Sequence, residues 1–292
     1  MMIKKKLSKN AKKIDKFLIS FLKNQKKSLL VKPMKYGVIS GGKKIRSTII
    51  LDAGKIFKIN EKKLLNICAA VECIHSYSLI HDDLPCMDDD SIRRGKPSTH
   101  IKFGEASAVL AGSSLLTLAF EIIADKKYLL NYKIKNEVIR FLAKCSGHTG
   151  IAGGQELDLK FENKKKSINQ IIDMQKKKTG KLFNFCLYAV GVIAKKDNKE
   201  KKSLSILGEE IGLLFQLADD FLDKKGSKKL LGKPVKKDNK KGKSTLLSLI
   251  GEKKANSYAN KLKKKILRNL EKHGKKAQEL IKTIEFILDR KF

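Results

Sequence analysis

The chain has 292 residues, a formal net charge of +35, 41% hydrophobic and 33% charged residues, and only four prolines. This balance excludes a disordered or fibrous chain and favours a globular, helix-rich protein. Only six of the 65 basic residues are arginines, and the lysines lie in short runs along the whole chain. That distribution favours a solvated lysine-rich surface over a nucleic-acid module, so we expect no specific nucleic-acid partner, only nonspecific binding of polyanions at low salt.

The first predicted element is an amphipathic helix, in which apolar residues recur at helical spacing at Ile14, Phe17, Leu18, Phe21 and Leu22. No apolar run typical of a signal peptide follows the basic N-terminus. Elsewhere the apolar stretches are interrupted well before the ~18 residues that a membrane span needs, so we expect no membrane insertion. The five cysteines form no CxxC pair, which predicts a reduced, cytoplasmic protein.

A loop is predicted at 36–43. It places Gly41 and Gly42 before a helix start and adds the basic side chains of Lys43 and Arg46. Backbone amides and cations at such a position can bind a diphosphate, although glycine–lysine loops are common and the signal alone is weak.

A predicted helix at 62–79 leads into the first aspartate cluster, where five carboxylates fall within nine residues, from Asp82 to Asp90. Carboxylates at this density raise one another's pKa unless cations neutralise them, and an all-oxygen set suits Mg²⁺. Pro85 should break the helix and bring Asp88 back towards Asp82. The alternative is a solvated acidic turn.

Arg93 and Arg94 follow this cluster, in a predicted loop at 93–98. Together with Arg46 they place half of the arginines in two short motifs, which indicates that planar, bidentate guanidinium groups are needed there. His75, in the preceding helix, could face the same cavity or serve as a structural histidine.

Further helices are predicted at 106–124, 136–148, 167–192, 204–223, 245–269 and 278–290, with loops at 162–166, 195–202 and 224–243. Alternating strand patterns are nearly absent, so one large all-α domain over residues 1–292 is expected. Lys178-Thr179-Gly180 and Gly242-Lys243-Ser244-Thr245 are further candidates for phosphate contact. The second of these lacks the spacing of a P-loop.

A second aspartate cluster lies in the helix predicted at 204–223. Asp219 and Asp223 are four residues apart and share a helix face, with Asp220 beside them. The rest of this helix is apolar, and carboxylates on a mostly buried element are rare unless they are paired or bound to metal. An ordinary acidic helix face is the alternative, but two such clusters in one chain favour a shared metal–diphosphate site.

The order of these motifs resembles the trans-isoprenyl diphosphate synthases (polyprenyl synthetases), and most of all the bacterial farnesyl diphosphate synthases. The resemblance covers nearly the whole chain and includes Gly153-Gly154-Gln155 between the two clusters. It implies an all-α helical bundle around a central catalytic cavity, the isoprenoid synthase type of fold, and a homodimer. It also implies head-to-tail condensation of isopentenyl diphosphate with dimethylallyl and geranyl diphosphate to give farnesyl diphosphate.

The resemblance further implies site roles, with about two or three Mg²⁺ ions expected when substrate is bound. Metal binding would fall to Asp82, Asp88 and Asp219, supported by Asp83 and Asp223. The allylic diphosphate would contact Arg93, Lys178, Thr179, Gln216 and Lys243. Isopentenyl diphosphate would contact Lys43, Arg46, His75 and Arg94.

Product length is expected to depend on Tyr77 and Ser78, which stand five and four positions before the first aspartate. An aromatic residue at Tyr77 and the insertion Pro85-Cys86 resemble makers of 15-carbon products, although Tyr77 could simply pack in the core. The alternatives are the same chemistry with a 10- or 20-carbon product, and a non-catalytic homologue. Intact carboxylates in both clusters speak against the latter.

Overall fold

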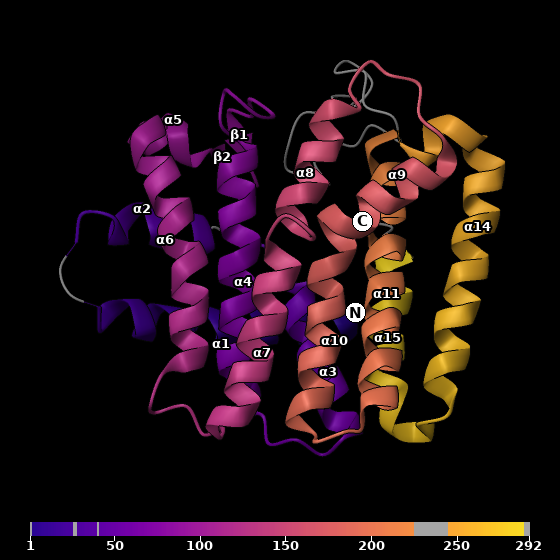
Figure 1. Ribbon diagram of the computed structural model, residues 1–292, viewed down its shortest axis with the longest axis horizontal. Coiled ribbons are helices and arrows are strands. Elements are labelled where there is room, and N and C mark those ends of the chain that lie inside the picture. The colour runs from indigo at the N-terminus through magenta and orange to yellow at the C-terminus, as the bar shows by residue number, and fades with distance from the viewer. Residues whose placement is uncertain (1, 26–27, 40, 225–244, 289–292) are drawn as a thin grey trace.

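A computed structural model describes residues 2–25, 28–39, 41–224 and 245–288, and in this part of the chain the fold is almost entirely helical (Figure 1). The first half begins with three helices that lead up to a long fourth. These helices are α1 (Met2–Lys23), α2 (Val31–Val38), α3 (Ile45–Ile56) and α4 (Lys62–Asp82). A short antiparallel pair of strands follows, β1 (Ile92–Arg93) and β2 (Lys96–Pro97), with Arg93 opposite Lys96.

The chain then continues through α5 (Thr99–Phe103), α6 (Glu105–Ala124), α7 (Tyr132–Ser146), α8 (Ile151–Lys160) and α9 (Ile168–Gln175). A five-residue π-helix, η1 (Lys176–Gly180), joins α9 to α10 (Lys181–Ile193). The last elements are α11 (Asn198–Lys224), α14 (Leu246–Glu271), the short 3₁₀-helix η2 (Gly274–Ala277) and α15 (Gln278–Leu288). Helix α14 is kinked at Gly251, where the backbone leaves the helical region.

The centre of the bundle is formed where α4 packs against α6 and where α10 packs against α11. Nearly every residue of α3 and α10 is buried, as expected for helices enclosed on all sides. One hydrophobic cluster runs from Leu7 in α1 to Ile287 in α15, so the two ends of the described chain share a core. The predicted all-α bundle is confirmed.

The predicted helices exist, but several of their bounds differ for identifiable reasons. Helix α7 starts before the predicted position because the Asn131 side chain caps it by accepting a hydrogen bond from the Ile134 amide. The helix predicted at 167–192 starts at its Ser167 cap but is interrupted by η1. Helix α11 begins at Asn198, inside the predicted loop at 195–202, and the predicted loop at 93–98 contains the β1–β2 pair. The predicted loop at 224–243 falls, from residue 225 on, outside the described residues.

Three helices, α2, α5 and α8, have no counterpart in the sequence prediction. For α3 the sequence predicted a helix start after Gly42 but no extent, because almost all residues of α3 are buried and it carries no apolar stripe opposite a polar face. Helices α2, α5 and α8 have ten residues or fewer, too few for a periodic pattern to stand out.

Helix α6 corrects the expectation that every apolar stretch is interrupted well before a membrane-spanning length. By length and composition alone it could cross a membrane, and 44% of its most apolar window is buried in the bundle. Its buried side packs on α4, while Val109 and Leu110 are exposed on the other side.

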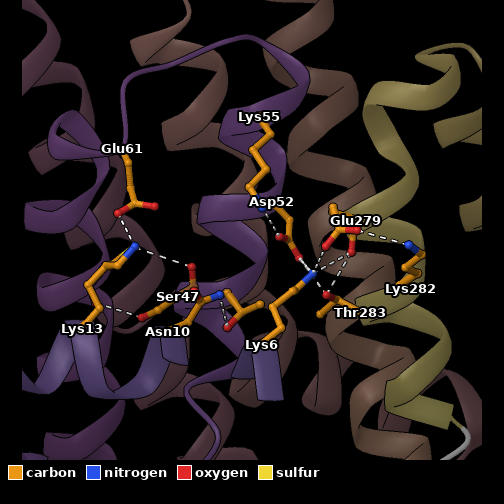
Figure 2. Close-up of polar contacts among 12 residues, drawn as sticks. Lys6, Asn10, Lys13, Ser47, Asp52, Lys55, Glu61, Glu279, Lys282 and Thr283 are labelled. Carbon is orange, nitrogen blue, oxygen red and sulfur yellow. Dashed lines mark hydrogen bonds and ion pairs between the residues drawn. The ribbon is translucent and has the colours of Figure 1, made fainter. Parts of the chain in front are cut away.

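The two ends of the chain are tied to α3 by a polar cluster (Figure 2). The Lys6 ammonium in α1 lies 2.7 Å from Oδ2 of Asp52 in α3 and 3.2 Å from Oε2 of Glu279 in α15. The Thr283 hydroxyl donates to the same Asp52 oxygen over 2.7 Å. Asp52 is completely buried, so this cluster fixes α1 and α15 against the helix that follows the Gly41-Gly42 loop.

Candidate active site

Both aspartate clusters lie at the carboxyl ends of helices that run towards the same end of the bundle. Helix α4 ends at Asp82, next to the β1–β2 pair, and Asp219 and Asp223 lie in the last two turns of α11 (Figure 1). The carboxyl end of a helix carries a partial negative charge from its dipole. Carboxylates at two such ends therefore add negative charge to negative potential, an arrangement that favours bound cations.

The first cluster folds back on itself after α4 ends, as the position of Pro85 predicted. The Asp88 amide donates to the Asp82 carbonyl over 2.8 Å, and the Asp90 amide donates to the Asp83 carbonyl over 3.1 Å. Asp89 sits in the left-handed region at φ 43°. The turn thus returns Asp88 to the level of Asp82, so that their two carboxylates influence each other.

The half-buried Asp82 carboxylate is the most perturbed member of this cluster. Burial raises its pKa to about 6, Asp88 and Asp83 add to the increase, and Lys178 and Arg93 oppose it. The Asp82 carboxylate thus interacts electrostatically with cations from η1 and from the β1–β2 pair, and with the neighbouring carboxylates. A carboxylate held among like charges is a candidate for metal binding.

Asp83 differs from Asp82 because it is buried against Arg93. The Arg93 guanidinium donates to Asp83 from Nε, over 2.9 Å, and from Nη2, and it also reaches Oδ2 of Asp90 at 3.2 Å. Burial raises the pKa of Asp83, and the hydrogen bonds from Arg93 lower it. If Asp83 bound a metal ion or Arg93 bound a diphosphate, the hydrogen bonds between these two side chains would have to break or be shared with that ligand.

The donor set fits a hard, oxygen-binding ion such as Mg²⁺. Asp82 and Asp88 offer carboxylate oxygens under mutual repulsion, which a divalent cation would relieve. Among the described residues no group of three or more acidic, histidine or cysteine side chains is arranged to hold a metal on its own. Mg²⁺ does not need such a group, because it is usually held by one or two carboxylates together with waters and substrate phosphates.

The second cluster separates into two kinds of aspartate. Asp219 and Asp223 are half-buried, and Asp219 is close enough to Arg46 to raise the pKa of that guanidinium. Asp220 is buried and accepts hydrogen bonds from the side chains of Gln175 and Gln216, over 3.1 and 2.9 Å.

The π-helix η1 presents Lys178 and Thr179 between the two clusters. The Lys178 ammonium is 2.6 Å from Oδ2 of Asp158 in α8, and the Thr179 hydroxyl donates to Oε1 of Gln216 over 2.9 Å. A π-helix frees backbone groups from the regular pattern and is frequent at functional sites. Sequence reasoning missed Asp158, although it follows the Gly153-Gly154-Gln155 motif by three residues. It also missed why Gly154 is needed: a side chain there would collide with the backbone of Lys178.

A separate group of cations forms around the Gly41-Gly42 loop. Nη1 of Arg94 donates to the Gly41 carbonyl over 2.7 Å, and Nη2 lies 3.4 Å from Nε2 of His75. Burial and the positive charge of Arg46 and Arg94 hold the pKa of His75 well below its usual range, so its ring is neutral and accepts this contact. Gly42 has φ 99°, and a Cβ there would lie 2.9 Å from Cζ of Arg94.

Arg46 is the third member of this group around the Gly41-Gly42 loop. It is 9% exposed, its guanidinium lies over the Phe183 ring at 4.6 Å, and its buried Nε has no hydrogen-bond partner in the part of the chain that the structure describes. Burial lowers the pKa of Arg46. Three residues predicted to share one anion, Arg46, His75 and Arg94, are therefore brought together.

Of the paired lysines that follow the glycines, Lys43 is exposed and Lys44 is buried. The Lys43 ammonium lies 5.7 Å from the centre of the Phe286 ring in α15. Lys44 has φ 43°, and its ammonium bonds the Val38 carbonyl at 3.1 Å and Asp15 at 3.2 Å. Lys44 was not singled out in the sequence, and no signal there separates it from Lys43.

Tyr77 and Ser78, the predicted product-length residues, lie one turn before the end of α4. The Tyr77 hydroxyl donates to the Ser146 carbonyl at the end of α7 over 3.3 Å, and its ring meets the His81 ring edge-on. Burial and the nearby Asp82 raise the pKa of Tyr77 to about 12. The Ser78 hydroxyl bonds the His75 carbonyl within the helix. Their effect on product length stays a prediction, and Lys243 lies outside the described residues.

Comparison with known sequences identifies one family. The family model described as polyprenyl synthetase matches residues 27–284. The chain is 42% identical to the farnesyl diphosphate synthase of Escherichia coli over 237 residues, which is 80% of this chain and 79% of that protein. It is 38% identical to the farnesyl diphosphate synthase of Bacillus subtilis over 256 residues, which is 81% of this chain and 86% of that protein.

Comparison with solved structures agrees. The fold is similar to an FPP/GFPP synthase from Zymomonas mobilis, with a TM-score of 0.87 and 35% identity over 98% of each chain. It is also similar to a geranyltransferase from Helicobacter pylori that was crystallised with magnesium and isoprenyl diphosphate. That match has a TM-score of 0.83 and 32% identity, over 98% of this chain and 96% of that one.

Proposed function

The chain belongs to the polyprenyl synthetase family, and from this premise we propose that it is a farnesyl diphosphate synthase. It would condense isopentenyl diphosphate head-to-tail with dimethylallyl diphosphate, and then with the geranyl diphosphate so formed. The observation that carries the proposal is the pair of carboxylate clusters at the ends of α4 and α11, with Lys178, Arg93 and Arg46 close to them. Anions and cations gathered in this way suit a metal-bridged diphosphate.

We propose that Asp82, Asp88 and Asp219 would hold Mg²⁺, with Asp83 and Asp223 in support. When bound there, the metal would supply Lewis-acid stabilisation of the charge that develops on the leaving diphosphate. Asp82 suits this role because its pKa of about 6 reflects a site that is costly to leave without a cation. Asp83 would contribute mainly by orienting Arg93, which donates to it from both Nε and Nη2.

The cationic groups would bind two different diphosphates. Arg93 and Lys178, with Lys243 from the part of the chain that is not described, would hold the allylic diphosphate near the carboxylates. Lys43, Arg46, His75 and Arg94 would hold isopentenyl diphosphate, and the mutual proximity of Arg46, His75 and Arg94 supports this grouping. The neutral His75 would act as a hydrogen-bonding group rather than a charge. Arg46, stacked on Phe183, would offer a fixed guanidinium.

The reaction then needs positioning and electrostatics rather than a protein nucleophile. The allylic carbon–oxygen bond breaks and its electron pair leaves with the diphosphate. The double bond of isopentenyl diphosphate forms the new carbon–carbon bond, and a proton is lost, which we assign to the departing diphosphate. Thr179 and Gln216 would line the allylic site and face the positive charge that forms on the substrate.

The test of this function is a product assay with purified protein, labelled isopentenyl diphosphate and dimethylallyl diphosphate, with and without Mg²⁺. Farnesyl diphosphate should dominate with Mg²⁺, and turnover should be lost after chelation. A dominant 10- or 20-carbon product would keep the reaction but refute the assigned length. Absence of any condensation at every Mg²⁺ concentration would leave only the non-catalytic homologue.

We also propose a cytoplasmic homodimer, built as a single domain over residues 1–292. The exposed side of α6 supports the dimer, because Val109 and Leu110 of α6 are exposed apolar side chains, as is Ile101 of α5, and α5 packs on α6. A second copy would cover this face. Light scattering should give twice the chain mass for the natural sequence, and Leu110→Glu should shift it towards the monomer. The four buried thiols support a reducing location.

A further inference from the structure

Asp220 stands apart from the other two aspartates of the second cluster. Only 4% of its surface is exposed, and its two carboxylate oxygens accept hydrogen bonds from two different glutamine side chains. Gln175 donates to Oδ2 over 3.1 Å and Gln216 donates to Oδ1 over 2.9 Å. These donors come from the end of α9 and from the preceding turn of α11, so Asp220 joins the segment that carries η1 to the helix that carries Asp219.

The hydrogen bonds to Asp220 decide which way the Gln216 amide points. Both oxygens of Asp220 accept hydrogen bonds from glutamine NH₂ groups, so the NH₂ group of Gln216 faces Asp220 and its carbonyl oxygen faces the opposite way. On that side Oε1 of Gln216 accepts the Thr179 hydroxyl over 2.9 Å. The amide and the hydroxyl are therefore held in one orientation by the Asp220 carboxyl group behind them.

We propose that Asp220 is a positioning residue for Gln216 and not a ligand of the metal ions. This inference rests on the proposed function, in which Gln216 and Thr179 line the allylic site. With Asp220 in place, the negative end of the Gln216 amide dipole is directed towards Thr179 and the substrate. Positive charge that forms on the allylic group is then stabilised by a dipole that needs no reorientation during the reaction.

The two roles predict different results for Asp220→Asn. A metal ligand needs the carboxylate charge, but an anchor for Gln216 needs only one acceptor oxygen. Asparagine keeps that oxygen and offers an NH₂ group to Gln175. Among the described residues the buried Oε1 of Gln175 has no hydrogen-bond partner, so Gln175 can turn its amide over and accept from the new NH₂ group. Gln216 would then keep its orientation.

The experiment compares Asp220→Asn with Asp219→Asn, the same isosteric change one residue earlier in α11. We expect Asp220→Asn to retain kcat within about fivefold and the Mg²⁺ concentration for half-maximal rate within about twofold. Asp219→Asn should lower kcat by about 100-fold or more and raise the Mg²⁺ requirement. Calorimetry of Mg²⁺-dependent binding of inorganic diphosphate gives a second readout without turnover, in which only Asp219→Asn should weaken binding.

Action through Gln216 is tested by removing the acceptor altogether. Asp220→Leu should lower kcat by about 10- to 100-fold while the KM for each diphosphate changes little. In a Gln216→Ala background the same change should have almost no further effect, because the group that Asp220 orients is gone. Should Asp220→Leu fail to fold, Asp220→Asn and its melting temperature still decide the metal role.

Three outcomes would overturn the proposal. Asp220→Asn could lose activity and diphosphate binding as severely as Asp219→Asn, which would make Asp220 a metal ligand. The effects of Asp220→Leu and Gln216→Ala on kcat could multiply, which would mean that Asp220 acts elsewhere. Asp220→Leu could leave kcat unchanged, which would remove any positioning role. Failure of the proposed function looks different, because the natural sequence itself would then form no condensation product, while calorimetry would still compare Asp219 with Asp220.

Discussion

Asp52 in α3 and Asp82 at the end of α4 are both shielded carboxylates whose pKa is raised chiefly by burial, yet their surroundings differ. Around Asp52 the protein supplies the counter-charge itself, through Lys6 at 2.7 Å, together with the Thr283 hydroxyl at the same distance. Around Asp82 the neighbouring charges have both signs. Lys178 and Arg93 lower the pKa of Asp82, and Asp88 and Asp83 raise it.

The difference separates a structural ion pair from the site that we propose binds a metal ion and a diphosphate. The Asp52 cluster joins α1, α3 and α15, and its charges are balanced within the fold (Figure 2). Asp82 sits where a helix dipole and neighbouring carboxylates concentrate negative charge. Loss of a charge in the first region should therefore reduce stability, and loss of a charge in the second should reduce catalysis.

The largest effect is expected from Asp82→Asn. Asparagine keeps one oxygen but lacks the negative charge on which the proposed metal binding depends, so kcat should fall by about 10²- to 10³-fold. The melting temperature should stay the same or rise, because repulsion by Asp88 and Asp83 is relieved. Steady-state kinetics and thermal unfolding measure the two effects. A large drop in melting temperature would show that the Asp82 charge is structural, like that of Asp52.

The reverse pattern is expected from Lys6→Met. This change leaves Asp52 buried without its main cation, and loss of one partner from a buried pair should lower the free energy of unfolding by about 3 kcal/mol. The kinetic constants of the folded enzyme should change little. Lys55→Met is the matched control, because Lys55 contacts the same carboxylate at 3.7 Å but is 55% exposed. It should cost less than ~0.5 kcal/mol in urea denaturation.

The pH dependence of the Lys6→Met variant follows from the same carboxylate. Loss of Lys6 removes an influence that lowers the pKa of Asp52, so the pKa in the folded variant should rise further above its unfolded value. A group with a raised folded pKa favours the folded state as it becomes protonated. The stability deficit should therefore shrink as the pH falls through that pKa. A deficit that grows on acidification would contradict the assignment.

The sequence predicted the first cluster better than the structural charges around Asp52. Asp82, Asp88, Asp219 and Asp223 are close in sequence within two clusters, and Pro85 indicated the turn that brings Asp88 back. Lys6 and Asp52 are 46 residues apart in the chain, Asp52 and Thr283 are 231 residues apart, and none of the three lies in a local pattern. Such a cluster is defined only by helix packing. The same reason hid Asp158, whose role depends on the contact between α8 and η1.

Secondary structure shows a similar division. Long helices with an apolar face, such as α1 and α11, were predicted from periodicity. The π-helix at Lys176–Gly180 was not, because its residues continue the helical pattern on both sides. Its presence depends on contact with α8, where Gly154 allows the backbones to approach, and with α11.

A smaller effect on the kinetics is expected from a change beside Arg46, His75 and Arg94, the residues proposed to bind isopentenyl diphosphate. Gly42→Ala would place a Cβ 2.9 Å from Cζ of Arg94 and strain a backbone at φ 99°. The KM for isopentenyl diphosphate should rise by about tenfold, with the KM for geranyl diphosphate nearly unchanged.

Gly41→Ala is the control for this change, because Gly41 has a similar φ of 92° but its Cβ would meet none of the described residues within 4 Å. It should cost about 1 kcal/mol of backbone strain and leave the KM for isopentenyl diphosphate within about twofold. Equal kinetic effects of the two substitutions would show that strain, and not the place of Arg94, decides binding.

Tyr77 combines a structural contact with a position near the proposed catalytic site. Its hydroxyl donates to the Ser146 carbonyl, and its ring lies one turn before Asp82. Tyr77→Phe removes only the hydrogen bond and should cost about 1 kcal/mol of stability, with farnesyl diphosphate still the main product. Tyr77→Ala removes the ring as well and should shift part of the product towards 20 carbons. Chromatographic sizing of labelled products measures the shift. If Tyr77→Ala loses stability but keeps its 15-carbon product, the ring belongs to the core alone, and the control of chain length must be sought elsewhere.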